Sequence, residues 1–267
     1  MKKLIRLALF FSALSGALIS WEEFSQFLSL GNITVQTGAP AAEFLFWKSL
    51  APEELRYWPV FLYRSGRLKE KIESEQPVSF LLRRRGASNF YIDLELLRPS
   101  FTVRWKEKTF YLTGEGRIWD VQHPSNNALS ADDLPQTPPF ILSETLPPPT
   151  ETGSDATVVA NSVFPAGLLA EWLGGLESNG WLGHTRLVEV SKREGKYLLR
   201  LKMNFAKKAV SVLLWGERSR WKGISSAVSE ILNQLQLSGG DIIIDATYTD
   251  RIIVRSGPVG GQEGSGK

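Results

Sequence analysis

The pattern of apolar and polar residues between 209 and 255 predicts a strand, a helix and two more strands, in that order. Residues 209–215 form a run of apolar and β-branched side chains, which is typical of a strand. Over 221–237 the apolar spacing changes to the one that gives a helix a single apolar stripe. The stripe consists of Ile224, Val228, Ile231, Leu232 and Leu235. Burial of five such side chains contributes roughly ten kcal/mol, so we expect this helix to belong to a core.

Two strands are expected after the helix. Residues 241–248 and 251–255 are rich in isoleucine and valine, and Thr249 and Asp250 leave room only for a tight hairpin turn between them. The second of these strands is expected to close the fold, with no later element to cover its outer edge. An exposed edge strand can accept a strand from another protein.

A small α+β module is expected upstream. Residues 33–36 favour a strand, and residues 41–75 carry a helical pattern. Residues 78–96 then alternate as two strands joined by a turn. The order β, α, α, β, β is expected to place two helices on one face of a short sheet. Six aromatic residues of the helical part are interpreted as core and not as a ligand site: Phe44, Phe46, Trp47, Tyr57, Trp58 and Phe61.

The remaining chain is expected to be a mixed α/β domain with an antiparallel sheet and two amphipathic helices. Besides the C-terminal stretch, apolar runs predict strands at 101–105, 110–112, 117–119, 187–190 and 197–203. The second helix is expected over Leu168–Leu176, with Asn179 and Gly180 closing it in a left-handed cap. The predicted fold class is therefore α+β.

The stretch from 122 to 161 has a different composition, because seven prolines are scattered among serine, threonine and acidic residues. We identify 140–142 as its apolar segment. The composition predicts an extended, largely uncompacted connection that this short segment pins to a domain.

Residues 1–21 begin with positive charges and continue as an apolar run up to Trp21. A helix over Leu4–Trp21 would be roughly 27 Å long, enough to cross the hydrocarbon core of a membrane as a signal anchor. A cleaved signal peptide fits this stretch equally well, because residues 15–17 are small. Both alternatives place the rest of the chain outside the cytoplasm. The expected organisation is an anchor at 1–21, a first module at 30–105, a second domain at 106–255 with its connection at 122–161, and a flexible tail at 256–267.

Composition and motifs argue against catalysis and against nucleic-acid binding. The net charge of +3 is small and dispersed, and the run at 83–85 is interpreted as a solvated strand end. The chain contains no cysteine, and neither His123 nor His184 has a second ligand at metal-binding spacing. Asp245 and Asp250 are better explained by a strand and a turn than by a carboxylate pair. We therefore predict no catalytic, metal or cofactor site, and no enzyme.

Four segments of the sequence resemble a known family. Residues 97–105 (LRPSFTVRW) precede 110–119 (FYLTGEGRIW), and further on 212–216 (VLLWG) precede 244–248 (IDATY). Together with the N-terminal run and the β, α, α, β, β module, they resemble in the right order the bacterial cell-division proteins FtsQ and DivIB. In that family a polypeptide-transport-associated (POTRA) domain precedes a C-terminal β domain.

The resemblance implies a non-enzymatic scaffold of the division machinery, a bitopic protein of the inner membrane with its bulk in the periplasm at the septum. It also favours an uncleaved anchor. The implied partners are FtsB/FtsL-type division proteins, with a strand of FtsB added to the last strand of the sheet. The residues that would contact the partner are Tyr248, Arg251, Ile252, Ile253, Val254 and Arg255.

Two other classes of function remain open from the sequence. One is a different scaffold of envelope assembly or secretion that carries the same small module. The other is a secreted hydrolase or binding protein, whose site would be built from residues distant in the sequence and would show as a concave pocket.

Overall fold

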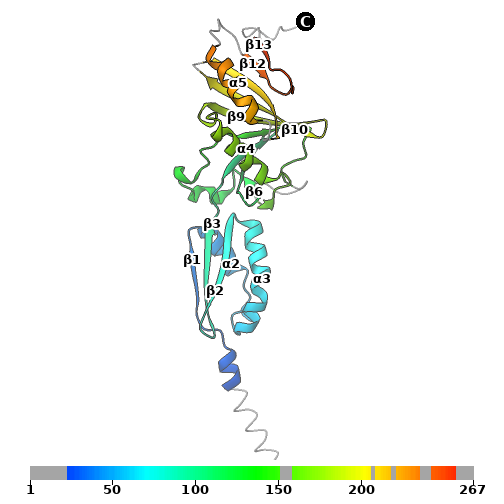
Figure 1. The fold of residues 1–267 in the computed structure, drawn as a ribbon. Helices are drawn as coiled ribbons and strands as arrows, with labels where there is room; N and C mark the ends of the chain where they lie inside the picture. Colours follow the sequence, from blue (N-terminus) through cyan, green and yellow to red (C-terminus); the bar gives the residue numbers. More distant parts are fainter. Residues whose placement is uncertain (1–22, 151–157, 206–207, 218–220, 235–241, 257–267) are drawn as a thin grey trace, which may run out of the picture. The chain divides into compact units, whose positions relative to one another are not determined.

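The computed structural model describes residues 23–150, 158–205, 208–217, 221–234 and 242–256 (Figure 1). The chain divides into two compact units, Met1–Leu97 and Arg98–Lys267. Each unit has its own cluster of buried apolar residues, and the two clusters have no residue in common.

The first unit packs two helices against a three-stranded sheet. Its elements are β1 (Ile33–Thr37), α2 (Pro40–Lys48), α3 (Trp58–Glu75), β2 (Val78–Arg85) and β3 (Asn89–Leu96). The strand order is β1-β3-β2, with β1 parallel and β2 antiparallel to β3. Phe46 of α2, Phe61 and Ile72 of α3, and the alternating residues Ile92 and Leu94 of β3 are fully buried. Alternation along the strands therefore gives this small sheet one face that the helices cover.

The second unit contains one large mixed sheet. Its strands are β4 (Phe101–Trp105), β5 (Lys108–Leu112), β6 (Arg117–Asp120), β7 (Phe140–Leu142), β8 (Ala160–Asn161), β9 (Thr185–Arg193), β10 (Lys196–Phe205), β11 (Lys208–Trp215), β12 (Ile242–Asp245) and β13 (Ile253–Ser256). In the described residues their order is β13-β12-β11-β10-β9-β7-β4-β5-β6-β8. Its helices are α4 (Ala166–Ser178) and α5 (Trp221–Gln234), with three short 3-10 helices, η1 (Pro124–Ala128), η2 (Ala131–Asp133) and η3 (Leu182–His184).

The expectation of an antiparallel sheet is wrong. Three strand pairs, β4–β7, β7–β9 and β11–β12, are parallel. The β11–β12 pair is parallel because the chain crosses over through α5 between the two strands, and a helical crossover returns the chain in its original direction. The strand predicted at 101–105 is β4, and it belongs to this sheet and not to the first unit.

The proline-rich stretch contributes a strand to the middle of the sheet. β7 lies between β4 and β9 and is parallel to both. Phe140 and Leu142 are buried, and η1 and η2 also come from this stretch. The structure therefore differs from the expected uncompacted connection. Three residues are enough for a strand here, because β7 has a partner strand on each side.

Helices α4 and α5 cover one face of this sheet (Figure 1). The stripe expected on the second helix is present in α5, where Val228 and Leu232 are buried and Ile224 and Ile231 pack against the core. Leu235 lies outside the described residues. On α4, Leu169, Trp172 and Leu176 are buried in the same core. On the other face, the 3-10 helix η1 covers Trp119 of β6, whose indole donates to the Asn126 side chain at 2.9 Å. Over β7, β9, β10 and β11 this face is lined by half-buried and exposed residues, and we call that part the open face.

A membrane anchor is not part of the described structure. The expected anchor at 1–21 lies outside the described residues, and among the helices that are described none combines the length and the apolar character needed to cross a bilayer. This finding corrects the prediction of a single-pass membrane protein, because no such spanning helix is seen in the described residues.

Candidate protein-binding edge strand

The strand expected to bind a partner lies at one edge of the large sheet. β13 pairs with β12 in antiparallel register, with Ile253 opposite Asp245 and Arg255 opposite Ile243. In the part of the chain that the structure describes, β13 pairs with no other strand. It spans Ile253–Ser256, so it begins two residues later than the run predicted at 251–255, and the expected tail beyond Ser256 lies outside the described residues.

The connection before β13 is longer than a tight hairpin turn. β12 ends at Asp245, and residues 246–252 join it to β13. The Asp245 carboxylate accepts hydrogen bonds from the backbone N–H of Thr247 at 3.1 Å and from its hydroxyl at 2.6 Å. Ala246 is still buried and donates its N–H to the Leu213 carbonyl of β11 at 3.0 Å. The local turn at Asp245 and Thr247 then starts the connection, so a two-residue turn at Thr249 and Asp250 does not form.

The Trp215 indole fixes this connection to the sheet. At the end of β11, its Nε1 donates to the carbonyl of Thr247 at 2.8 Å. The carbonyl of Trp215 in turn accepts from the Trp221 indole of α5 at 2.8 Å, and the carbonyl of Gly216 accepts from the Trp172 indole of α4 at 3.0 Å. Three indole N–H groups therefore link both helices and the connection to the end of β11.

Two of the predicted contact residues lie in this connection. The Tyr248 side chain is 42% exposed, and the Arg251 guanidinium lies 5.3 Å from its ring centroid. An exposed tyrosine with a cation over its ring presents both an apolar body and a polar tip to a partner. Ile252, which the resemblance assigns to the partner contact, is half-buried and packs against the core.

The last three predicted residues alternate across the two faces of β13. Val254 lies opposite the buried Ile244, so it faces the side that the helices cover, and it remains 40% exposed. Ile253 and Arg255 face the open side, where Ile253 is half-buried and Arg255 is exposed. The described large apolar residues of the second unit that are clearly exposed are Val163, Tyr248 and Val254. Of these three, Tyr248 lies in the connection before the edge strand and Val254 lies in the strand itself.

The described polar residues do not assemble into a catalytic group around this edge. His123 is buried before η1, where its Nδ1 accepts a hydrogen bond from the Ser125 backbone at 3.2 Å, and His184 packs its ring against Phe205. No group of three or more histidine or acidic side chains within the described ranges is arranged to hold a metal ion. Asp245 is used in the turn described above.

One acidic residue has a displaced pKa for a structural reason. A hydrogen bond from the Ser130 hydroxyl, followed by one from its backbone N–H, lowers the pKa of Asp133, and the Arg98 guanidinium acts in the same direction. Because these contacts close η2 at the protein surface, the shift indicates a capped turn and not a catalytic acid.

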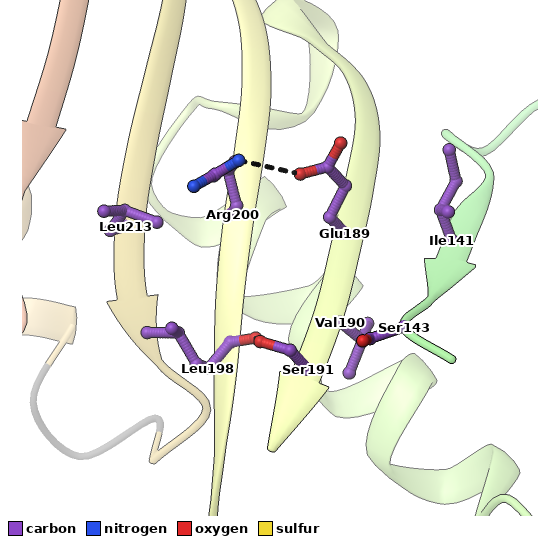
Figure 2. Close-up of a pocket in the computed structure, with 8 residues that line it drawn as sticks. All are labelled: Ile141, Ser143, Glu189, Val190, Ser191, Leu198, Arg200 and Leu213. Atoms are coloured by element: carbon purple, nitrogen blue, oxygen red, sulfur yellow. Dashed lines mark hydrogen bonds and ion pairs between the residues drawn. The ribbon is translucent and has the colours of Figure 1, made fainter. Parts of the chain in front are cut away.

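The open face carries a hollow that sequence patterns did not reveal. A cavity of about 270 Å³ lies over β7, β9, β10 and β11 (Figure 2). Its lining residues are Ile141, Ser143, Glu189, Val190, Ser191, Leu198, Arg200 and Leu213. The available signals were the alternation of Arg200 and Lys202 with buried Leu199, Leu201 and Met203, and the two-residue turn that pairs β9 with β10. The placement of β7 beside β9 does not follow from the sequence, because the two strands are remote in the chain.

Comparison with protein-family models gives no match, and comparison with curated proteins gives no match either.

Proposed function

We propose that this chain is a non-enzymatic scaffold of the FtsQ/DivIB type, which binds FtsB/FtsL-type division proteins by accepting one of their strands on β13. The observation that carries the proposal is the position of β13 at the edge of the described sheet, with Tyr248 and Val254 exposed beside it. The proposal concerns protein binding alone and includes no membrane anchor.

Strand addition suits the geometry of β13. Half of the backbone N–H and C=O groups of an edge strand point away from its one neighbour and remain available to a new strand. Backbone pairing supplies affinity, while side chains beside the strand supply specificity. Here the candidates for specificity are Tyr248, Arg251 and Arg255, which combine an aromatic ring with two exposed cations.

The placement of the resembling segments supports the same proposal. Residues 101–105 form β4, and 110–119 span β5, its turn and most of β6. Residues 212–216 end β11, and 244–248 cover the end of β12 and the start of the connection. Each of the four segments therefore contributes residues to the sheet that ends in β13, and the last two adjoin the proposed site.

The test is binding of the FtsB/FtsL-type pair from the same organism to variants of β13. Successive N–H groups along a strand point to opposite edges, so Ile253→Pro and Val254→Pro are made separately. One of the two substitutions removes a backbone N–H that points away from β12. This substitution is expected to abolish co-purification of the FtsB/FtsL-type pair. Tyr248→Ala is expected to weaken binding by about tenfold, since a buried tyrosine at an interface commonly contributes this much.

Val163→Ala is the matched control, because Val163 is an exposed apolar residue of the same unit that lies outside β13 and its connection. It is expected to bind normally. Thermal unfolding of each variant establishes that the monomer is folded. Full binding by both proline variants would show that the pair does not dock on β13, and absence of binding by the unaltered chain would remove the proposed partner.

A further inference from the structure

We propose that Glu73 closes β2, an edge strand of the first unit, to strand addition, and that loss of this closure lets β2 pair with β2 of a second copy of the chain. The inference concerns the three-stranded sheet and does not depend on the proposed function of β13. It gives a role to Glu73 and to the arginine run at 83–85, which the proposed function does not use.

The outer edge of β2 follows from the hydrogen bonds on its inner edge. In the described residues β2 pairs with β3 alone. The backbone N–H of Leu97, directly after β3, donates at 2.8 Å to the carbonyl of Pro77, directly before β2. Because the backbone groups of successive strand residues point to opposite edges, Val78, Phe80 and Leu82 direct theirs away from β3. A strand added to β2 would pair with these groups.

Glu73 of α3 occupies part of this outer edge. Its Oε1 accepts a hydrogen bond from the backbone N–H of Phe80 at 2.8 Å, and its side chain is only 23% exposed. Lys69, one turn earlier on α3, places its Nζ 3.9 Å from the same oxygen. The N–H of Val78 donates to the Gln76 carbonyl at 2.8 Å, so the first two outward donors of β2 are both used within the chain. An added strand would have to exchange the bond to the carboxylate for a weaker one to a neutral carbonyl.

Positive charge protects the other end of β2. Residues 83–85 are all exposed arginines. The Arg84 guanidinium lies 4.1 Å from the ring centroid of Trp58 and donates from its Nε to the Ala87 carbonyl at 2.9 Å, which holds it at the end of the strand. Charged side chains are one of the devices by which natural sheets keep edge strands from pairing with other chains. The capped donors at the start and the cations at the end therefore protect β2 over its length.

Between these two protected ends lies an apolar residue that favours association. Leu81 is 45% exposed, on the face of the small sheet that the helices do not cover. An exposed apolar side chain on an edge strand is a site of pairing between chains. Two copies related by a two-fold axis within one continuous sheet would pair β2 with β2 in antiparallel direction. This arrangement places the arginines of each copy beside the start of the other strand, so the two cationic ends do not meet.

The experiment compares variants of Glu73 in the full chain by hydrogen exchange and by sedimentation equilibrium. Glu73→Ala removes the acceptor, so we expect the Phe80 amide to exchange about tenfold faster and the dimer Kd to fall at least tenfold. Glu73→Asp, which keeps the charge but shortens the side chain, is expected to change both values in the same direction. Glu73→Gln keeps a carbonyl acceptor of the same reach and is expected to behave as the unaltered chain does.

Glu70→Ala is the matched control, because Glu70 is an exposed acidic residue of the same helix. It is expected to change neither value. Adding Leu81→Lys to Glu73→Ala brings like charges together in the expected dimer and should restore the original Kd, while the Phe80 amide still exchanges fast. Thermal unfolding of each variant establishes that the first unit is folded.

Each outcome decides one part of the inference. An unchanged exchange rate of the Phe80 amide in both Glu73→Ala and Glu73→Asp would refute the cap. Faster exchange without stronger self-association would show that Glu73 does not close the edge. A dimer that persists after Leu81→Lys is added would show that the two copies do not pair through β2.

Discussion

At the scale of single residues, Gly175 of α4 is the described glycine of the second unit that its neighbours approach most closely. A Cβ added to Gly175 would lie 2.6 and 2.7 Å from two ring carbons of Trp221, whose side chain is 1% exposed. Such distances are far shorter than a van der Waals contact, and a buried indole has no room to move. The absence of a side chain at this position therefore allows α5 to begin directly against α4.

Substituting Gly175 tests this packing. Alanine normally stabilises a helix relative to glycine by roughly 1 kcal/mol, but we expect Gly175→Ala to lower the free energy of unfolding by about 1–3 kcal/mol because of the overlap with Trp221. Gly174→Ala is the control, since a Cβ there meets nothing within 4 Å, and it is expected to stabilise the same helix. Urea unfolding of both variants measures the difference. Equal effects from the two substitutions would contradict the overlap.

The sequence could not reveal this contact, although it predicted the helices that make it. The helical spacing of apolar residues predicted Val228 and Leu232 as core positions. Such spacing depends on the sequence of a single helix and carries no information on which residues of two helices meet. Gly175 and Trp221 are distant in the chain, and only the tertiary fold brings them together. Tyr248, in contrast, could be proposed as a contact from its place in a motif of neighbouring residues.

At the scale of elements, β7 joins two parts of the large sheet. It has β4, β5, β6 and β8 on one side, and β9 to β13 on the other. Phe140 is fully buried, with its ring 6.2 Å from that of Phe101 and 6.4 Å from that of Trp172. Three residues therefore hold the centre of the sheet and also contact α4.

We expect Phe140→Ala to lower the free energy of unfolding by about 3–5 kcal/mol, because it leaves a cavity beneath α4 in the middle of the sheet. Ile141→Ala, on the open face, is expected to cost less since Ile141 is only half-buried. Denaturant unfolding followed by circular dichroism compares the two. A loss below about 1 kcal/mol for Phe140→Ala would mean that β7 is not part of the core.

The strand β7 shows where prediction from the sequence fails in this chain. A run of three residues is too short to show a period of two, and the surrounding prolines predict an extended connection. The strands β9, β10 and β11 are eight to ten residues long with clear alternation, and for that reason their positions were predictable. The parallel pairs made by β7 were not predictable, because both of its partners are remote in sequence. The parallel β11–β12 pair could have been predicted, because a helix connects the two strands.

At the scale of the whole molecule, each of the two units has its own hydrophobic core. The first core is made by α2, α3 and the three-stranded sheet, and the second by α4, α5 and the ten-stranded sheet. Every residue proposed to contact the FtsB/FtsL-type pair belongs to the second unit. Folding and partner binding are therefore expected to be properties of residues 98–267 alone.

Expression of residues 98–267 without the first unit tests this expectation. The fragment is expected to unfold cooperatively, with the same denaturant midpoint as the corresponding transition of the full chain, because no buried residue of its core comes from residues 1–97. A fragment that lacks a cooperative transition would show that the second core depends on the first unit.

The bond from the Trp215 indole to the Thr247 carbonyl has a practical consequence. Indole fluorescence depends on the polarity around the ring and on the hydrogen bond of its N–H group. Trp215 is half-buried at the point where the sheet meets the chain that leads into β13. Trp215, one of the nine tryptophans of the chain, thus lies beside the proposed docking edge, and movement of that edge would change the surroundings of its indole.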